Sequence, residues 1–549
     1  MKKAKLIFFL FAALCLLLTA CSPAAETTGG GIVVTTSLKG KPVLVGDIPC
    51  AFPLTDEPVS LNFMAYRNTA ADYEDVYVWQ QYEKMTGVDV NWTFTEGSNR
   101  GELLYTALTN RTDLDLVLRH RVSSSRLMQY GESGLIIDLA KDDLLKTYAP
   151  NCWHYLQTHP VALASVTNPD GSIYALPQIN SGAELRVSRK IFINKTWLAN
   201  VGMELPTTTQ ELYALLCAFK DLDANGNGDP NDEIPLCSHD WLSVRDAFYG
   251  AFGLMNRGVH NDIVDCDEAT GKVRLIAAAE GYRDFLSYFR TLYAEGLLAP
   301  NTFTMSAEEW LSNAQTDRIG VFCNTNLAGL PANMASNWVG IEEALEGPNG
   351  DKLWTAVRAD FHSTGNAVIP ATCDNPALVL RWLDYFWTDE GTLFYHMGVE
   401  NKTFIVKEDG SYDYAPFIYE EMDAENSTFD ETVAKYSPYP GGGNPMVEVA
   451  PYFRGGEMAQ IPAAAARALF AYQPKEFWPS FTFTAEETAR LNALSADIEK
   501  LCTDSRIAFI TGARPLSEWD SYCRQLSSFR AEELLEIYQA ALDRYTKSQ

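Results

Sequence analysis

"VSLNFMAYRNTAADYEDVYVWQQYEKMTGVDVNWTFT", residues 59–95, contains a strand, a helix and a second strand in succession. Residues 59–66 and 88–95 are rich in apolar and aromatic side chains, and the segment near 72–86 has the spacing of a helix. A further helical pattern follows at 101–110, and the short apolar run 114–120 is typical of a third strand. Strands that alternate with helices predict an α/β protein.

Polar and charged residues follow two of these strands. Tyr66 and Arg67 come at the end of the first strand, and Arg119 and His120 come at the end of the third. In open parallel sheets, ligands bind beyond the carboxyl ends of the strands. We therefore expect these side chains to lie where a ligand would be met.

Helical patterns recur along the rest of the chain. The run PTTTQELYALLCAFKDLD (206–223) has a clear start, because Thr208 and Glu211 have the spacing of a capping box. Residues 436–458 are rich in proline and glycine and predict a long surface loop. The other predicted helices cover residues 281–294, 376–388, 485–503 and 531–545.

The segment DLDANGNGDPNDEIP (221–235) holds five acidic residues, three asparagines and two glycines. Oxygen ligands at alternate positions, with a glycine at the sharp turn, are what a calcium loop requires. A hydrated turn is the alternative. Two registers supply enough oxygens, one starting at Asp221 and one at Asp223, and we favour the second. The predicted calcium ligands are Asp223, Asn225, Asn227, Asp229, Asp232 and Glu233.

The residues after this loop indicate what the ion would do. Ile234-Pro235-Leu236 favours an extended conformation, whereas a regulatory EF-hand needs a second helix at this point. We therefore expect a structural calcium ion that holds a helix to a strand, and not a sensor or a catalyst.

Residues 1–20 have the pattern of a secretory signal, with three lysines before an apolar run over 6–18 that is too short for an ordinary membrane span. The closing LTAC (18–21) resembles the lipobox of bacterial lipoproteins, which implies cleavage before Cys21 and a lipid on its sulfur. Ordinary cleavage beside an incidental cysteine is the alternative. Residues 21–50 are then expected to be a flexible, lipid-anchored tether on the outer face of the cell membrane.

The composition excludes some classes of function. A formal net charge of −28 repels nucleic acid, so no nucleic-acid partner is expected. Beyond Cys15 and Cys21, nine cysteines remain, which is an odd number without CxxC spacing. That pattern argues against a zinc site and against a dense disulfide framework, although one or two bridges stay open.

Taken together, these features resemble a known family. The chain is similar to the family 1 extracellular solute-binding proteins of carbohydrate ABC transporters, in particular LipO-like lipoproteins and alginate-binding proteins. The family's calcium loop has the form DxNxNG followed by Asp-Glu, and this chain has one extra residue before Asp232. The matching stretches are NPDGSIYALP (168–177), IFINKTWLANVGMELPTTTQELYALLCAFK (191–220), the acidic loop, EGLLAPNTF (295–303) and FITGARPLSEWDSY (509–522).

The resemblance implies a periplasmic-binding-protein-like fold of type II, with two α/β lobes, a hinge and a ligand cleft between the lobes. The first lobe is expected at about 55–165 plus 305–365, and the second at about 170–300 plus 370–549. Such a protein would capture an oligosaccharide or other carbohydrate as a monomer and deliver it to ABC permease subunits in the membrane.

A saccharide offers C–H faces that stack on aromatic rings and hydroxyls that need polar partners. Aromatic residues in polar, loop-like stretches are therefore candidates, and packing in a core is the alternative for each. The predicted ligand-binding residues are Tyr66, Arg67, His120, Trp241, Trp338, Trp354 and Tyr439.

Two other classes of function stay open. A secreted glycan-cleaving enzyme is one, although the sequence has no HExxH motif, no GxSxG motif and no phosphate-binding glycine loop. A ligand-sensing subunit of a membrane receptor is the other. Product formation would identify the enzyme, and stoichiometric binding without product would favour the carrier.

Overall fold

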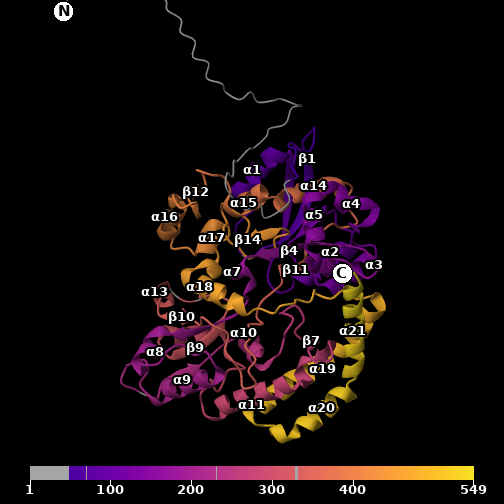
Figure 1. The fold of residues 1–549 in the computed structure, drawn as a ribbon. Coiled ribbons are helices and arrows are strands. Elements are labelled where there is room, and N and C mark those ends of the chain that lie inside the picture. The colour runs from indigo at the N-terminus through magenta and orange to yellow at the C-terminus, as the bar shows by residue number, and fades with distance from the viewer. Residues whose placement is uncertain are drawn as a thin grey trace, which may run out of the picture.

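The structure is a computed structural model, which describes residues 48–548 apart from 68, 70, 230, 328, 329 and 331. Two α/β lobes lie one above the other in Figure 1, each built around its own sheet. The predicted signal and the predicted lipidation site at Cys21 lie outside the described residues. The expectation of a two-lobed α/β fold is confirmed.

The first lobe contains a six-stranded sheet of mixed direction in the order β14-β4-β11-β3-β1-β2. Strand β1 pairs in parallel with β2 and β3, whereas β11 is antiparallel to both of its neighbours. The strands are β1 (Val59–Tyr66), β2 (Val88–Thr95), β3 (Leu116–Leu118), β4 (Leu176–Ser181), β11 (Phe361–Val368) and β14 (Val447–Val449).

Helices cover both faces of this sheet, and each face has its own apolar core. Phe63 and Trp382 belong to the larger core, and Val117 and Leu104 belong to the smaller one. A ribbon of β12 (Phe404–Val406) and β13 (Tyr412–Tyr414) lies at one side. The helices are α1 (Tyr77–Thr86), α2 (Arg100–Thr109), α3 (Ser124–Glu132), α4 (Leu144–Tyr148), α5 (Pro150–Thr158), α6 (Pro160–Val166), α14 (Pro376–Asp384), α15 (Asp389–Met397), α16 (Pro416–Glu425) and α17 (Phe429–Val433).

The second lobe contains a four-stranded sheet in the order β10-β5-β9-β6. Its strands are β5 (Lys190–Asn194), β6 (Ile234–Leu236), β9 (Ile319–Asn324) and β10 (Trp338–Gly340), with a separate hairpin of β7 (Val264–Asp267) and β8 (Lys272–Leu275). Its helices are α7 (Ala183–Arg186), α8 (Lys195–Val201), α9 (Thr209–Asp221), α10 (Trp241–Tyr249), α11 (Glu280–Ala294), α12 (Ala307–Gln315), α13 (Ala332–Ala335), α18 (Gln460–Leu469), α19 (Ala485–Thr511), α20 (Trp519–Ser528) and α21 (Ala531–Ser548).

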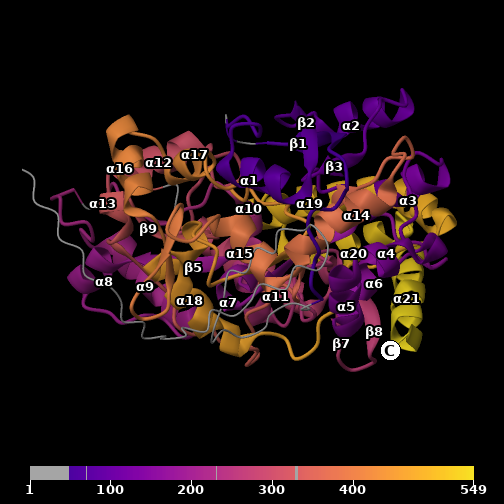
Figure 2. The same cartoon turned by 90° about the horizontal axis from the view of Figure 1, so that it is seen from above.

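Within the described residues, the chain passes between the lobes at three places: 181–190, 357–361 and 449–460. The first two passages run antiparallel, since Val187 forms a bridge with Val357. A further segment follows α18 and touches the first lobe, where Ser480 N donates to Ser165 Oγ at 3.0 Å. The C-terminal helices then run along one side of the molecule, with α19 against α3 (Figures 1 and 2).

The lobe boundaries differ from the expected ranges. Strands β9 and β10, in the segment 305–365, pair with β5 in the second lobe, and the residues of 370–452 pack in the core of the first lobe. The chain therefore belongs to the first lobe over 48–181 and 361–455, and to the second lobe over 182–360 and 456–548. The boundaries differ from the expected ranges because the passages between the lobes are short turns and helical turns that carry no change in composition.

Three further expectations concern a helix start, the cysteines and membrane-spanning helices. Helix α9 starts as predicted, with the Thr208 side chain accepting from Glu211 N at 3.0 Å, and the Glu211 carboxylate accepts from Thr207 N at 2.8 Å. All nine cysteines within the described residues are unpaired. Across the same residues, we find no helix with the length and apolar character needed to cross a bilayer.

Candidate ligand-binding site

Strands β1, β2 and β3 are parallel and end at the same edge of the larger sheet, at Tyr66, Thr95 and Leu118. Ligands of open α/β sheets bind beyond such strand ends. The chain has 71 acidic and 43 basic residues, yet guanidinium groups gather at this edge. They belong to Arg67, Arg100, Arg119 and Arg121.

Arg119 is buried at the end of β3 and holds a loop across the strand ends. Its Nε donates to the carbonyl of Gly442 at 2.8 Å, and its Nη1 donates to the carbonyl of Pro438 at 2.8 Å. It also donates to the hydroxyl of Tyr73 and to the carbonyl of Pro440. With its donors used in this way, Arg119 positions the loop 438–442 and is not free to bind a ligand.

Three consecutive glycines let this loop lie close to the strand ends. Gly441, Gly442 and Gly443 all have positive φ, at 92°, 64° and 83°. A Cβ on Gly442 would lie 2.5 Å from Nη2 of Arg121, and one on Gly443 would lie 3.2 Å from the backbone of Arg119. Glycine is therefore required here both for its conformation and for the close approach.

Beside the glycine loop lies a buried carboxylate. Glu448 of β14 is 3% exposed and accepts a hydrogen bond from Asn444 Nδ2 at 2.5 Å. Burial raises the pKa of Glu448 to about 7, although the nearby charge of Arg121 acts in the opposite direction. Arg121 itself is exposed and donates to the carbonyl of Gly441 at 3.2 Å.

Amide and imidazole groups continue this polar face toward the second lobe. Gln178 Nε2 donates to Asn180 Oδ1 at 3.1 Å, and Asn180 Nδ2 lies 3.3 Å from Nδ1 of His362. Desolvation, followed by the charges of Arg358 and Arg121, holds the pKa of His362 well below its usual value. The imidazole is thus neutral and lies among cations from both sides of the lobe boundary.

The second lobe presents a basic pair at the start of β5. Arg189 Nη1 donates to the carbonyl of Ser188 and to Thr325 Oγ1, while Nη2 lies 3.7 Å from Oδ2 of Asp240. The next residue, Lys190, is fully buried and donates to the carbonyl of Thr325 at 2.8 Å. Burial lowers the pKa of Lys190 to about 7. Both lobes therefore bring basic groups to their common boundary.

The acidic loop lies elsewhere, at the end of the second lobe's smaller sheet, between α9 and β6. Asn225 and Asn227 both donate to the carboxylate of Asp232 at 3.1 Å, so these side chains converge. Asp223 Oδ1 and Glu233 Oε2 are buried oxygen atoms without a hydrogen-bond partner. Desolvation, opposed by backbone donors and reinforced by Asp232, raises the pKa of Glu233.

Two unsatisfied carboxylate oxygens in one loop fit a bound cation, because burying such groups without a partner is costly. Within the part of the chain described here, no cluster of three or more His, Cys, Asp or Glu side chains has the arrangement of a metal site. Amide and backbone oxygens would therefore have to supply part of the coordination, as calcium allows.

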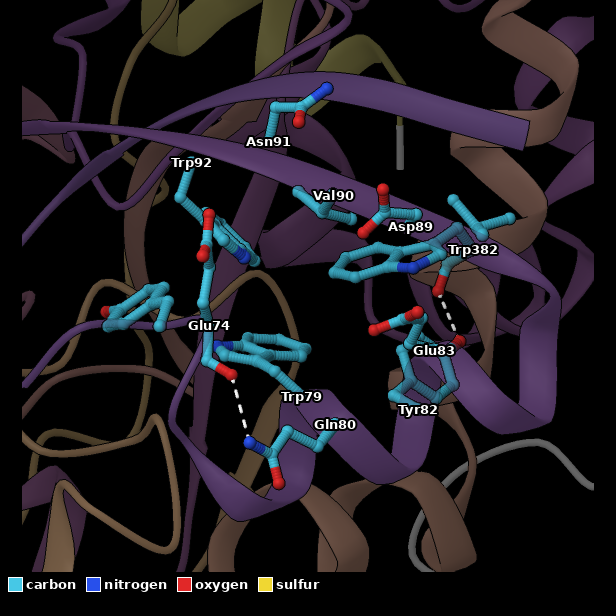
Figure 3. A pocket seen from close by; sticks show the side chains of 12 residues that line it. Glu74, Trp79, Gln80, Tyr82, Glu83, Asp89, Val90, Asn91, Trp92 and Trp382 are labelled. Atoms are coloured by element: carbon cyan, nitrogen blue, oxygen red, sulfur yellow. Dashed lines mark hydrogen bonds between the residues drawn. The ribbon is translucent and has the colours of Figure 1, made fainter. Parts of the chain in front are cut away.

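A pocket of about 390 Å³ lies between α1 and β2 on the outer side of the first lobe (Figure 3). Trp79, Trp92 and Trp382 form its wall, and Trp79 stacks on Trp382 with 5.4 Å between ring centroids. Glu74, Glu83 and Asp89 line its rim. This pocket is formed by core residues of the first lobe and contains none of the strand-end arginines.

Comparison with known proteins places the chain among relatives. The model of the bacterial extracellular solute-binding protein family matches residues 68–392, which is more than half of the chain. The protein belongs to this family. The resemblance drawn from the sequence is confirmed.

Three curated relatives of this solute-binding protein are similar over different lengths. The fructooligosaccharide ABC transporter substrate-binding protein FusA of Streptococcus pneumoniae serotype 4 is 26% identical over 90% of this chain and 92% of its own. Lipoprotein LipO of Bacillus subtilis is 26% identical over 40% of this chain and 44% of its own. The polygalacturonan/rhamnogalacturonan-binding protein YtcQ of B. subtilis is 23% identical over 55% of this chain and 58% of its own.

Solved structures share the fold of this solute-binding protein. FusA of S. pneumoniae in complex with kestose superposes with a TM-score of 0.70, 24% identity and coverage of 89% of this chain and 100% of its own. An EF-hand mutant of FusA with fructo-nystose gives the same values. The alginate-binding protein AlgQ2 without calcium ion has a TM-score of 0.65, 21% identity and coverage of 89% and 99%.

Three of the predicted ligand-binding residues lie at the strand-end edge. Tyr66 is half-buried, with the guanidinium of Arg100 4.5 Å from its ring centre. Arg67 is paired with Glu96 at 2.7 Å and lies over the ring of Phe94. Their part in ligand binding stays a prediction.

The third residue, His120, is buried between Thr95 Oγ1 and the carbonyl of Leu118, each at 2.9 Å from a ring nitrogen. Desolvation lowers the pKa of His120 to about 4, so the ring is neutral. Its place behind the strand ends suits support of the edge rather than contact with a ligand.

The other four predicted residues lie in apolar cores. Trp241 packs against Phe289 and Phe303, with 5.3 and 4.8 Å between ring centroids. Trp338 packs on Phe322 at 4.6 Å. Trp354, in the core of the second lobe, and Tyr439, in that of the first, are almost fully buried. Core packing, the alternative named for each, is what their surroundings show, and a ligand role stays untested.

Sequence reasoning missed Arg121, Arg189 and Arg358. Arg121 directly follows His120, so the strand-end rule could have included it. Arg189 directly precedes the apolar run of β5. A basic residue at the start of a strand is common, and the sequence does not show that its side chain lies near the other lobe. Arg358 lies in a passage between lobes that nothing in the local sequence indicates.

Proposed function

We propose that this protein captures an oligosaccharide outside the cell, between its two lobes, and delivers it to the permease of an ABC importer. The observation that carries the proposal is the match to FusA, a substrate-binding protein of an ABC transporter, over 92% of that relative's length. The polar, strand-end edge of the first lobe, opposite basic groups of the second, supports a ligand at the lobe boundary.

The physical basis of capture is a difference in affinity between open and closed lobe arrangements. A ligand that touches both lobes binds the closed arrangement better, so it shifts the population toward that state. A permease that contacts both lobes can then distinguish the loaded protein from the empty one.

Calcium, the membrane anchor and the monomeric state belong to the same proposal. The ion would be held by Asp223, Asn225, Asn227, Asp229, Asp232 and Glu233. Its only role would be to provide a positively charged partner for the buried Asp223 and Glu233 oxygens, which have no hydrogen-bond partner. The contacts of Asp232 with both asparagines favour the register that starts at Asp223. Cys21 would carry the lipid that keeps the protein on the outer face of the membrane.

The test is a thermal-shift screen against neutral and acidic oligosaccharides, followed by calorimetry and chromatography of the recovered sugar. We expect one ligand bound per chain and recovered unchanged. A cleaved product would favour the glycan-cleaving enzyme, and no binding by any saccharide would overturn the proposal.

A further inference from the structure

Arg358 lies in the passage 357–361 between the two lobes. Its backbone is fixed, because Arg358 N donates to the carbonyl of Arg186 at 3.0 Å and Arg186 Nε donates to the carbonyl of Arg358 at 2.9 Å. Its side chain is half-buried. Among the described residues, no side chain or carbonyl forms a hydrogen bond or ion pair with its guanidinium. A desolvated cation is thus held in place at the lobe boundary, and among the described residues no anion pairs with it.

The nearest charges make this arrangement more unfavourable. Desolvation, followed by the charge of Arg189, lowers the pKa of Arg358 to about 10, and Arg121 acts in the same direction. Of the nearby carboxylates, Asp246 already pairs with Arg245 at 2.8 Å, and Glu457 is half-buried without an ion pair among the described residues. These carboxylates offset the repulsion only in part.

Two observations besides the pKa show that the basic groups have unused donors. Arg189 Nε is buried and has no hydrogen-bond partner. Arg121, on the opposite lobe, is exposed and uses Nη2 on the carbonyl of Gly441. Guanidinium groups match carboxylate and sulfate geometry through paired N–H donors, and such charge-assisted bonds are about twice as strong as neutral ones.

From these contacts we propose that the ligand is an acidic saccharide, whose carboxylate or sulfate lies between Arg358 of the passage and Arg121 of the first lobe. This inference rests on the proposed function and adds the chemical class of the ligand. The anion would neutralise the facing cations and connect the two lobes, so its binding favours closure.

The curated relatives leave this class open, because FusA is named for fructooligosaccharides and YtcQ for polygalacturonan. The arginines of this chain therefore carry the inference by themselves. Carboxylate and sulfate share the chemistry that the arginines recognise, and the experiment separates them.

Calorimetry with two matched pairs of probes tests the inference. Trigalacturonate is compared with its methyl ester, which has the same size without the charge, and sulfated maltotriose is compared with maltotriose. We expect one charged probe to bind at least tenfold more tightly than its neutral partner, and to weaken as salt is raised. The pair that shows the difference identifies carboxylate or sulfate.

Substitutions then connect the effect to the arginines. Arg358→Met should weaken the charged probe roughly tenfold or more and leave its neutral partner's affinity unchanged, and Arg358→Lys should weaken it less. Arg283→Met, on the exposed face of α11, is the matched control and should change nothing. Melting curves check that each variant is folded, and Arg121→Met provides a second variant if Arg358→Met does not fold.

The outcomes separate the two proposals. Equal binding of charged and neutral probes overturns the acidic class and keeps carbohydrate capture. Binding of neutral saccharides alone also overturns the acidic class and keeps carbohydrate capture. Failure of all saccharides in the screen overturns both. A charged probe whose affinity is unchanged in both arginine variants also overturns the inference.

Discussion

Arg119 and Gly442 are 323 positions apart in the chain, and the Nε of the arginine donates to the carbonyl of the glycine at 2.8 Å. This bond, together with those to Pro438 and Pro440, holds the glycine loop over the ends of β1 and β3. A buried cation that is satisfied by carbonyl groups replaces the ion pair that usually accompanies a buried arginine.

The first prediction concerns this contact. Arg119→Met should lower the free energy of unfolding by about 3 kcal/mol, because several carbonyl groups lose their donor in a buried environment. Denaturant unfolding measures the loss. Arg283→Met, an exposed arginine near Glu280 with 3.8 Å between charged atoms, should leave the stability within error. Equal stability of Arg119→Met and the parent would contradict the role of Arg119 as a support for the loop.

The second prediction concerns Trp241, which lies in the core of the second lobe. Trp241→Ala should lower the free energy of unfolding by about 3–5 kcal/mol, because it leaves a cavity among phenylalanine side chains. Leu242→Ala, the exposed neighbour on the same helix, should cost little. A variant that keeps its melting temperature but loses saccharide affinity would instead support the ligand role predicted from the sequence.

The third prediction concerns the acidic loop. A chelator should lower the melting temperature by roughly 5 °C, because an ion that binds only the folded state stabilises it. Glu233→Gln should remove this response to the chelator. Asp221→Asn should keep it, since Asp221 belongs only to the other register. A loss of the response in Asp221→Asn, but not in Glu233→Gln, would reverse the register.

The fourth prediction concerns pH. Burial raises the pKa of Glu448 to about 7, so the folded state binds its proton more tightly than the unfolded state does. The contribution of this group to stability is therefore present below about pH 4.5 and is lost as pH rises toward 7. Glu448→Gln should remove a penalty of about 3 kcal/mol at pH 8 and have little effect at pH 4.5.

Melting curves of Glu448→Gln and the parent at both pH values measure this difference. Glu102→Gln, at an exposed position of α2, is the control. A stabilisation of the same size at both pH values would show that the effect comes from packing and not from ionisation.

Local patterns predicted much of the fold. The segments 59–66 and 88–95 are strands with the predicted bounds, because strong alternation and flanking turn residues define them. Leu212, Leu215, Leu216 and Phe219, which recur at helical spacing in the predicted helix that starts after Thr208, are fully buried. Helix α19 extends past the predicted end at 503 to Thr511, where Gly512 closes it.

What the sequence could not show depends on contacts between distant segments. Strand β14 lies inside the predicted long loop 436–458. It has only three residues, bordered by glycine and proline, so its sequence does not indicate a strand, and it is a strand because it pairs with β4. Aromatic residues were predicted as ligand contacts, but Trp338 and Tyr439 pack in cores, since a polar neighbourhood in sequence does not determine which way a ring points. Arg121 and Arg358 lie in segments of different lobes, so no local pattern connects them.

The order in which the chain visits the two lobes has a consequence for biogenesis. Because β14 completes the larger sheet, that sheet lacks an edge strand until residue 449 has been made, by which time every strand of the smaller sheet already exists. Neither lobe is formed by one uninterrupted stretch of chain, because each is made of two segments. A nascent chain of this design therefore cannot complete the larger sheet until most of its residues have been synthesised.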